Sequence, residues 1–266
     1  MRLKDKTAIV IGAGQGPGTG MGNGRATVLR FADEGAKVMA VDRDLASAEE
    51  TVAMVKPAGN DCFAFEADVV RETTLAAAIA AAMARWGRID ILHYNVGVSI
   101  AGGDAQLLDI TEEAFDRITA INLRGAVMAC KHVVPIMRNQ RSGSILMISS
   151  LAAVEKYPFV TYKATKAAMI AFTQQVAIQN AEYGIRANVI LPGLMDTPMA
   201  VDTRARASGK SREQVAAERD ARVPLRHKMG TAWDVANAAL FLASDEAAFI
   251  TGVSLLVDGG GALNVG

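Results

Sequence analysis

GAGQGPGTGMGNG, residues 12 to 24, carries a glycine at every second position without a break. It follows the short apolar run TAIVIG at 7–12, and it leads into a segment from Gly24 to Glu34 whose apolar residues recur at helical spacing. A glycine-rich turn between a strand and a helix is typical of a phosphate-binding loop, but such a loop needs only about three glycines. The residues that follow must therefore decide which glycines serve that purpose.

The next predicted strand, KVMAVD at 37–42, fixes the register of the glycine run. It ends on Asp42, which lies 18 residues after Gly24, close to the roughly 20 expected for the acidic group that binds an adenosine ribose. Counted from Gly18, the interval is 24 residues, which is too long for one helix and a tight turn. Pro17 also argues against an early helix start, because proline has no N–H to offer a phosphate.

This register gives the glycines separate roles. Gly12 ends the first strand, while Gly22, Asn23 and Gly24 open the helix beside the expected pyrophosphate. Residues 16–20 belong to an insertion, which we predict to bulge beside the adenosine or the pyrophosphate as a flap. A helix that began at Gly18 would contradict this register.

Short apolar runs alternate with helical segments along the rest of the chain. The predicted strands cover 7–12, 37–42, 62–68, 90–95, 143–150, 186–193 and 253–261. The predicted helices cover 24–34, 44–56, 72–85, 112–137, 162–182 and 233–243. Apolar strands separated by helices predict a parallel sheet that is covered on both faces. The fold class is therefore α/β, with a single Rossmann-like, doubly wound domain over residues 1–266 and a seven-stranded parallel sheet.

Residues 200–230 differ from this pattern, being rich in Arg, Asp, Glu and small residues. Two interpretations stay open: a solvated helical excursion, or a mobile lid over a substrate cleft. We expect the substrate-loop or lid segment to span 195–230.

Composition excludes several other functions. Lys plus Arg and Asp plus Glu each number 28, so no net charge favours nucleic acid or a membrane surface. Cys62 and Cys130 stand singly in apolar stretches, as buried thiols of a reducing compartment do. His93, His132 and His227 show no metal-ligand spacing, so no metal is predicted. Without a signal segment or an apolar run of membrane length, we expect a cytoplasmic protein whose partner is a small-molecule substrate.

Three polar residues near the fifth strand suggest acid–base chemistry. Ser150 ends that strand, and Tyr162 and Lys166 lie four residues apart, on one face of the following helix. A free phenol has a pKa of about 10, and a neighbouring ammonium group favours its charged form. The pair makes a usable general acid/base for an alcohol or a carbonyl, while a serine hydroxyl can hold the same substrate oxygen. Since no protein group carries a hydride, a cofactor must supply it.

At this point the chain resembles the short-chain dehydrogenases/reductases, from about Lys4 to Gly261. The matching stretches are the glycine loop with GNGRA, Asp42, ADV at 67–69, YNVG at 94–97, INLRG around Asn122, ISS at 148–150, YKATK at 162–166, LPGLMDTPM at 191–199 and FITGVSLLVDGG at 249–260. The resemblance implies a catalytic tetrad of Asn122, Ser150, Tyr162 and Lys166. Tyr162 would act as acid/base, Ser150 would polarise the substrate oxygen, Lys166 would lower the tyrosine pKa and hold the nicotinamide ribose, and Asn122 would hold a water in a proton relay.

The same resemblance implies how the cofactor is held. Asp68 and Val69 would meet the adenine, Asn95, Val96 and Gly97 the ribose side, and Pro192, Gly193, Met195 and Thr197 the nicotinamide amide. A homo-oligomer, a tetramer, is likewise implied by the resemblance alone.

The sequence departs from the family pattern at three places. The glycine loop carries its insertion, so its backbone contacts do not transfer one for one. Tyr94 stands where a small amide is common, and we interpret it as a strand residue packed under the cofactor. Ser150 lies 12 residues before Tyr162, where the family more often shows 13; Ser149 would restore 13, but the strand match GSILMISS favours Ser150.

Cofactor choice depends on Asp42 and its neighbour. A carboxylate accepts hydrogen bonds from ribose hydroxyls and repels a 2′-phosphate, which favours NAD over NADP. Arg43 could stack on the adenine or reach a phosphate. The prediction is an NAD-dependent oxidoreductase for a secondary alcohol or ketone. The alternatives are an NADP-preferring carbonyl reductase of the 3-oxoacyl type and a non-catalytic nucleotide-sensing protein on the same fold.

The substrate cleft should lie beyond the carboxyl ends of the strands. Its expected lining is mostly apolar: Ile100 to Gly103, Leu151, Ala152, Tyr157, Phe159, Met195 and Met199, together with the 200–230 segment. Of these, Ala152, Tyr157 and Met199 are predicted to contact substrate together with Ser150 and Tyr162. Because the lining has few fixed charges, the sequence suggests an uncharged or weakly polar substrate.

Overall fold

Seven parallel strands form one sheet in the order β3-β2-β1-β4-β5-β6-β9, which confirms the predicted fold class. The computed structural model describes residues 1–55 and 61–263. The strands are β1 (Thr7–Ile11), β2 (Lys37–Asp42), β3 (Cys62–Glu66), β4 (Ile91–Tyr94), β5 (Gly143–Ile148), β6 (Ile185–Pro192) and β9 (Ser254–Val257). All seven coincide with predicted runs, because a strand buried on both faces reads as a continuous apolar segment.

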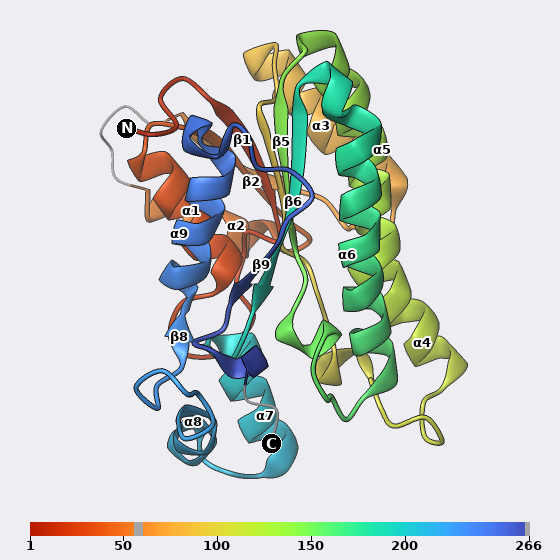
Figure 1. Cartoon of the computed structure of the whole chain (residues 1–266), viewed down its shortest axis with the longest axis vertical. Coiled ribbons are helices and arrows are strands. Elements are labelled where there is room, and N and C mark those ends of the chain that lie inside the picture. Colours follow the sequence, from red (N-terminus) through yellow and green to blue (C-terminus); the bar gives the residue numbers. More distant parts are fainter. Residues whose placement is uncertain (56–60, 264–266) are drawn as a thin grey trace.

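Helices cover both faces of this sheet (Figure 1). One layer contains α1 (Asn23–Asp33), α2 (Leu45–Ala53) and α9 (Ala232–Ala243). The other contains α3 (Glu72–Trp86), α5 (Gly125–Gln140) and α6 (Val160–Asn180), with α4 (Glu112–Thr119) leading into α5. Two hydrophobic cores result, one on each face. The predicted helix 44–56 ends at a residue outside the described range.

The order of the strands reverses between β1 and β4, since β2 and β3 lie on one side of β1 and all later strands on the other. At such a reversal the helices diverge to opposite faces, which leaves a crevice at the carboxyl ends of the strands. The residues that directly follow β1, β2, β4 and β5 therefore meet at one edge of the sheet. These include Gly12, Asn95 and Ser149.

The predicted helix 112–137 is continuous but not uniform. A π-helical turn, Ala120–Arg124, separates α4 from α5. One extra residue per turn rotates the following side chains relative to the preceding ones, and such turns are frequent at functional sites. Here the turn holds Asn122, whose side chain is fully buried.

Residues 195–231 form a separate layer beyond the carboxyl ends of the strands, at the bottom of Figure 1. Its elements are β7 (Met195–Asp196), a π turn (Pro198–Asp202), α7 (Thr203–Ser208), α8 (Arg212–Asp220) and β8 (Gly230–Thr231), and β7 pairs with β8. Val201, Val215, Val223 and Met229 form a small core of their own. The segment is therefore folded against itself as well as against the sheet, and its motion as a lid stays a prediction.

No helix in the described part of the chain is long and apolar enough to span a membrane.

His93 is a buried weak base in the middle of β4. It is fully buried next to the edge of Phe31, and neither ring nitrogen has a hydrogen-bond partner among residues 1–55 and 61–263. Burial disfavours the charged imidazolium and lowers the pKa of His93 to about 3. The unfolded chain, with a pKa near 6.5, therefore binds this proton more readily than the folded chain does.

We expect this difference to make the protein acid-sensitive. Above pH ~6.5 the neutral imidazole contributes no penalty; as the pH falls towards ~3, the free energy of unfolding should drop by about 1.4 kcal/mol per pH unit from this group. His93→Leu should remove that slope. Urea unfolding of both proteins between pH ~6.5 and ~5, above most carboxyl titration, measures it. Equal slopes in wild type and variant would contradict the assignment.

Candidate active site

The two ends of the glycine run meet where β1 ends and α1 begins. Gly12 adopts φ 84°, and a Cβ on Gly24 would lie 1.9 Å from the carbonyl oxygen of Gly12. Asn95, at the end of β4, donates to the same carbonyl through Nδ2 at 3.0 Å. The helix begins at Asn23 with Gly22 as its N-cap, as the register predicted, and no side chain among the described residues caps its free N–H groups. This close backbone approach and the uncapped helix end fit a dinucleotide pyrophosphate.

The insertion at residues 16–20 forms an arch, and Gln15 holds the two ends of this arch together. Its Nε2 donates to the carbonyl of Gly20 at 3.1 Å, and its Oε1 accepts from the N–H of Gly22 at 2.8 Å. The tip of the arch contacts the 195–231 layer, because the N–H of Thr19 donates to Asp202 and Arg206 donates to the carbonyl of Pro17. The arch therefore bridges the predicted pyrophosphate site and the predicted lid, a contact that the sequence did not indicate.

The predicted adenosine-binding residues lie beyond β2 and β3. Asp42 ends β2, and its two carboxylate oxygens accept from the N–H groups of Gly14 at 2.9 Å and Asp44 at 3.1 Å. Arg43 is exposed beside it. Asp68 accepts from the N–H of Val70 at 3.1 Å, and Val69 is buried between them. These hydrogen bonds fix both carboxylates at the same edge of the sheet.

Asn122 links the β4 end to α6. Its Oδ1 accepts from the N–H of Val98 at 2.8 Å, and its Nδ2 donates to the Val98 carbonyl at 3.0 Å and to Thr165 Oγ1 at 3.1 Å. Tyr94 packs against the π turn that holds Asn122. It is fully buried, and its hydroxyl donates to the carbonyl of Ile121 at 2.7 Å. Tyr94 is therefore a packed strand residue, and its position under the cofactor stays a prediction.

Val96 and Gly97 follow Asn95, and both lie next to the end of the Lys166 side chain. A Cβ on Gly97 would lie 2.9 Å from Lys166 Nζ, so a side chain here would displace the ammonium group from its present position. Lys166 is 2% exposed, and its Nζ donates to the carbonyls of Ile148 at 2.7 Å and Val96 at 3.4 Å. An ammonium group has three donors, which leaves one for another partner.

The two candidate serines have different surroundings. Ser149 is buried, and its hydroxyl donates to the carbonyl of Lys166 at 2.6 Å. The Ser150 hydroxyl accepts from the N–H of Ala152 at 3.1 Å, and it lies close enough to the Tyr162 phenol to lower the pKa of Tyr162 by hydrogen bonding. The geometry thus groups Ser150, Tyr162 and Lys166, with the Lys166 Nζ 5.8 Å from the centre of the Tyr162 ring.

Burial dominates the electrostatics of this group. It raises the pKa of Tyr162 to about 12, an increase that the Ser150 hydrogen bond and the charge of Arg204 partly offset. It also lowers the pKa of Lys166 to about 7. At neutral pH the phenol therefore carries its proton, as a general acid must.

Asp104 positions Tyr162 but has no signal in the sequence. Its carboxylate accepts from the N–H groups of Thr161 and Tyr162, both at 3.0 Å, and from the Ser99 hydroxyl at 3.1 Å. It thereby caps the N-terminus of α6, whose own N-cap, Phe159, offers no side-chain hydrogen bond. The capping residue lies 57 residues away in the chain, so no local motif marks it.

The other predicted nicotinamide and substrate residues lie on the segments that follow β5 and β6. Pro192 ends β6, and a Cβ on Gly193 would lie 2.6 Å from Asp258 Cα. The Thr197 hydroxyl caps the following π turn by accepting from the N–H of Ala200 at 3.3 Å. Met195 and Ala152 are buried, and Met199 is 45% exposed.

Tyr157 stacks beside Tyr162. Their ring centres are 5.5 Å apart, and the Tyr157 hydroxyl lies 3.1 Å from the Ser99 hydroxyl. The predicted substrate residue is thus in contact with the predicted acid/base.

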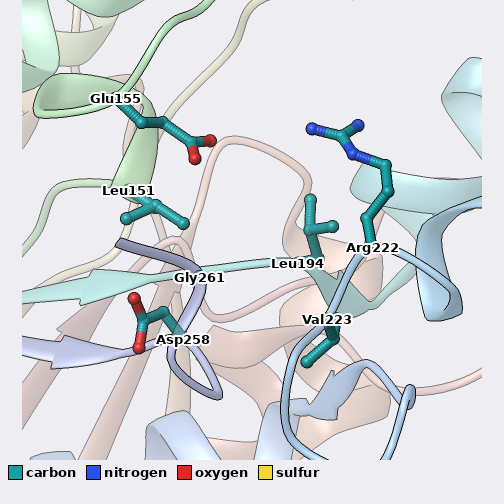
Figure 2. Close-up of a pocket in the computed structure, with 7 residues that line it drawn as sticks. All are labelled: Leu151, Glu155, Leu194, Arg222, Val223, Asp258 and Gly261. Carbon is teal, nitrogen blue, oxygen red and sulfur yellow. The ribbon is translucent and has the colours of Figure 1, made fainter. Parts of the chain in front are cut away.

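A cavity of about 150 Å³ opens between the β6 and β9 ends and the 195–231 layer. Figure 2 shows the carboxylates of Glu155 and Asp258 on one side and the Arg222 guanidinium on the other. Burial raises the pKa of Glu155, although the charges of Arg222 and Lys163 act against this. Asp258 accepts from the N–H groups of Gly260 and Ala262, so it holds the turn after β9.

Comparisons with known proteins show which family the chain resembles. A family model described as Enoyl-(Acyl carrier protein) reductase matches residues 18–262. A 2-(R)-hydroxypropyl-CoM dehydrogenase of Xanthobacter autotrophicus is 37% identical over 96% of this chain and 97% of its own length. A 3-oxoacyl-[acyl-carrier-protein] reductase of Thermotoga maritima is 33% identical over 98% of this chain and 99% of its own length. The crystal structure of a short-chain dehydrogenase/reductase of Burkholderia xenovorans superimposes with a TM-score of 0.90 and 40% identity, covering 100% of this chain and 99% of that one.

Proposed function

The chain belongs to the short-chain dehydrogenase/reductase family, and we propose that it is an NAD-dependent oxidoreductase that transfers a hydride between nicotinamide and a secondary alcohol or ketone. One observation carries the proposal. Ser150, Tyr162 and Lys166 lie together, beside the point where the backbones of Gly12 and Gly24 approach each other closely. The family uses a nicotinamide cofactor, NAD or NADP. A relative named for a hydroxypropyl group and another named as a 3-oxoacyl reductase support an alcohol and a ketone as the reacting groups.

Each side chain has a definite task in this reaction. In the reducing direction Tyr162 gives its phenolic proton to the carbonyl oxygen, and in the oxidising direction it takes that proton from the alcohol. Ser150 donates a hydrogen bond to the same oxygen and holds it in line. The donor that Lys166 keeps free suits a ribose hydroxyl, and Asn122 braces the loop above it through Val98. The cofactor supplies or accepts the hydride.

The cofactor would lie along the edge already described. Gly12, Gly22, Asn23 and Gly24 would face the pyrophosphate, and Asp42 would accept from the adenosine ribose. An ionised carboxylate at this position repels a 2′-phosphate, which supports NAD. Arg43 is the observation that favours the alternative, an NADP-preferring carbonyl reductase, because its exposed guanidinium could pair with a phosphate.

An absorbance assay at the NADH band tests the proposal. The protein is incubated with NAD and a panel of polyols, sugars, hydroxy acids and alicyclic alcohols, and with NADH or NADPH and the matching ketones. We expect turnover of at least one pair, with kcat/KM at least about tenfold higher for NADH than for NADPH, as one unfavourable charge contact allows. Comparable rates with both cofactors would overturn the choice of NAD. Cofactor binding without any turnover would favour the nucleotide-sensing alternative.

We further propose that the protein is a cytoplasmic homotetramer that acts on a small molecule rather than on nucleic acid or membranes. The balance of 28 basic and 28 acidic residues supports the absence of polyanion partners. Phe249 is fully exposed, and Leu256 on the edge strand β9 is 41% exposed, so apolar surface is available to a second copy. Light scattering in solution measures the assembly, and a monomer would contradict it.

A further inference from the structure

Three arginines of the 195–231 layer line one cavity. Arg204 comes from α7, Arg219 from the last turn of α8 and Arg222 from just after it, and the cavity measures about 340 Å³. Lys210 and Glu218 also line it, but they form an ion pair with each other at 2.5 Å. The wall therefore holds three arginine charges beyond this pair.

The opposite charges near these arginines form no ion pair with them in the part of the chain that the structure describes: Asp196 acts on Arg219 from a distance, and Glu155 acts on Arg222 across the neighbouring cavity. None of the three arginines is in an ion pair there, and Arg204 donates only to the carbonyl of Ala200 at 2.9 Å. Arg219 is 7% exposed, and its buried Nε has no hydrogen-bond partner in residues 1–55 and 61–263. Burial and the charges of Arg204 and Arg222 lower the pKa of Arg219 to about 10. Burying an unpaired guanidinium beside two like charges opposes folding, so it needs another explanation.

A chain of contacts leads from the cavity to the acid/base group. Ile100 lines it, and the preceding residue, Ser99, lies 3.1 Å from the Tyr157 hydroxyl. Tyr157 in turn stacks on Tyr162. The charge of Arg204 also lowers the pKa of Tyr162, which places the guanidinium within electrostatic range of the phenol.

From this geometry we propose that the substrate carries an oxyanion, a carboxylate or a sulfonate, which Arg204 and Arg219 bind while its secondary alcohol or ketone lies against Tyr162. The inference rests on the proposed function and names the substrate class for the same site. A planar guanidinium binds an oxyanion through paired charge-assisted hydrogen bonds, and both Arg204 and Arg219 line the cavity without an ion pair of their own in the described residues. The proposal departs from the uncharged substrate that the sequence suggested, because that expectation counted residues at strand ends and not arginines of α7 and α8.

A series of methyl-ketone acids tests the charge and its distance from the carbonyl. Acids of increasing length, from acetoacetate and levulinate upward, are each compared with their primary amides as substrates with NADH, and the best length is repeated as the sulfonate. The amide keeps the shape but not the charge. We expect kcat/KM for the best acid to exceed that of its amide by about 10- to 100-fold.

Variants separate binding from folding. Arg219→Met keeps the length of the side chain but removes its charge; we expect it to lower kcat/KM for the acid about 10- to 100-fold and to change that for the amide less than about twofold. The melting temperature of the free protein should stay the same or rise, because an unpaired buried charge is gone. Arg219→Lys should restore only part of the acid activity. Arg226→Gln, an exposed arginine of the same segment that does not line the cavity, serves as the control and should match wild type.

The outcomes distinguish this proposal from the function on which it rests. If acids and amides are reduced equally well, the oxyanion site is wrong and the oxidoreductase stands. The site is also wrong if Arg219→Met loses both activities and melts at a lower temperature, since this identifies a structural residue. If no ketone or alcohol reacts, the melting temperature with each acid decides. A rise with the acids alone that disappears in Arg219→Met supports the site, and the absence of such a rise overturns it.

Discussion

Gly24→Ala is expected to destabilise the protein by at least about 3 kcal/mol and to abolish binding of the nicotinamide cofactor. A Cβ at this position would lie 1.9 Å from the carbonyl oxygen of Gly12 and 2.7 Å from Asn95 Nδ2. Neither neighbour can move freely. Gly12 connects directly to β1, all of whose residues are buried, and its carbonyl already accepts from Asn95. Relief would require α1 to shift away from the strand end, which separates the two backbones that would hold the pyrophosphate.

Gly16→Ala provides the matched control within the same glycine run. In residues 1–55 and 61–263, no atom lies within 4 Å of a Cβ built on Gly16, and the φ of Gly16 is not in the left-handed region. The substitution should change the free energy of unfolding by no more than about 0.5 kcal/mol. Urea denaturation and titration with NADH fluorescence measure stability and cofactor affinity for both variants. Similar losses in the two proteins would show that the close backbone approach is not the reason for the glycine at 24.

Sequence periodicity predicted the sheet well, and the reason lies in its burial. Each strand between two helical layers must be apolar on both faces, so β1 and β2 appear as uninterrupted apolar runs. The start of α1 was also accessible, because the distance to Asp42 is set by one helix and one strand, both of known rise per residue.

From residue patterns alone, the candidate site was predictable only where its residues lie near strand ends or share a helix face; Asn122, in the π turn, came from the family resemblance. Tyr162 and Lys166 satisfy the second condition, and their spacing predicted that they lie together. Asp104 satisfies neither, since it caps α6 from another part of the chain. The same limit applies to Arg204 and Arg219, whose proximity depends on how α7 and α8 fold onto the sheet edge.

The choice between Ser149 and Ser150 needed side-chain directions that spacing did not supply. Successive residues leave a strand towards opposite sides, so only one of the pair can face the phenol. In the structure, the hydroxyl of Ser149 is bound to the α6 backbone and that of Ser150 faces Tyr162. The interval from Ser150 to Tyr162 is 12 residues, one fewer than the family more often shows. Ser150 is therefore matched to the family's serine by its place at the end of β5 and not by this interval.

Tyr162→Phe is expected to lower kcat by about 10²- to 10⁴-fold in both directions, because it removes the proton that the reaction needs. The ring that packs against Tyr157 stays in place, so the variant should fold and bind NADH as wild type does. Tyr183→Phe, which alters a tyrosine that packs against Arg138, is the matched control and should keep full activity. A Tyr162→Phe protein with wild-type turnover would refute the acid/base role.

The pH dependence of wild type supplies a second, independent test of this tyrosine. Burial raises the pKa of Tyr162 to about 12 in the protein without cofactor, so the phenol is protonated throughout the neutral range. Ketone reduction uses the protonated form and should stay constant from neutral pH until the phenol begins to ionise. Alcohol oxidation uses the phenolate, so kcat/KM for the alcohol should rise about tenfold per pH unit below the pKa. In Tyr162→Phe the residual oxidation rate should lose this slope, whereas a slope that survives the substitution would assign the titration to another group, such as Lys166, whose pKa burial lowers to about 7.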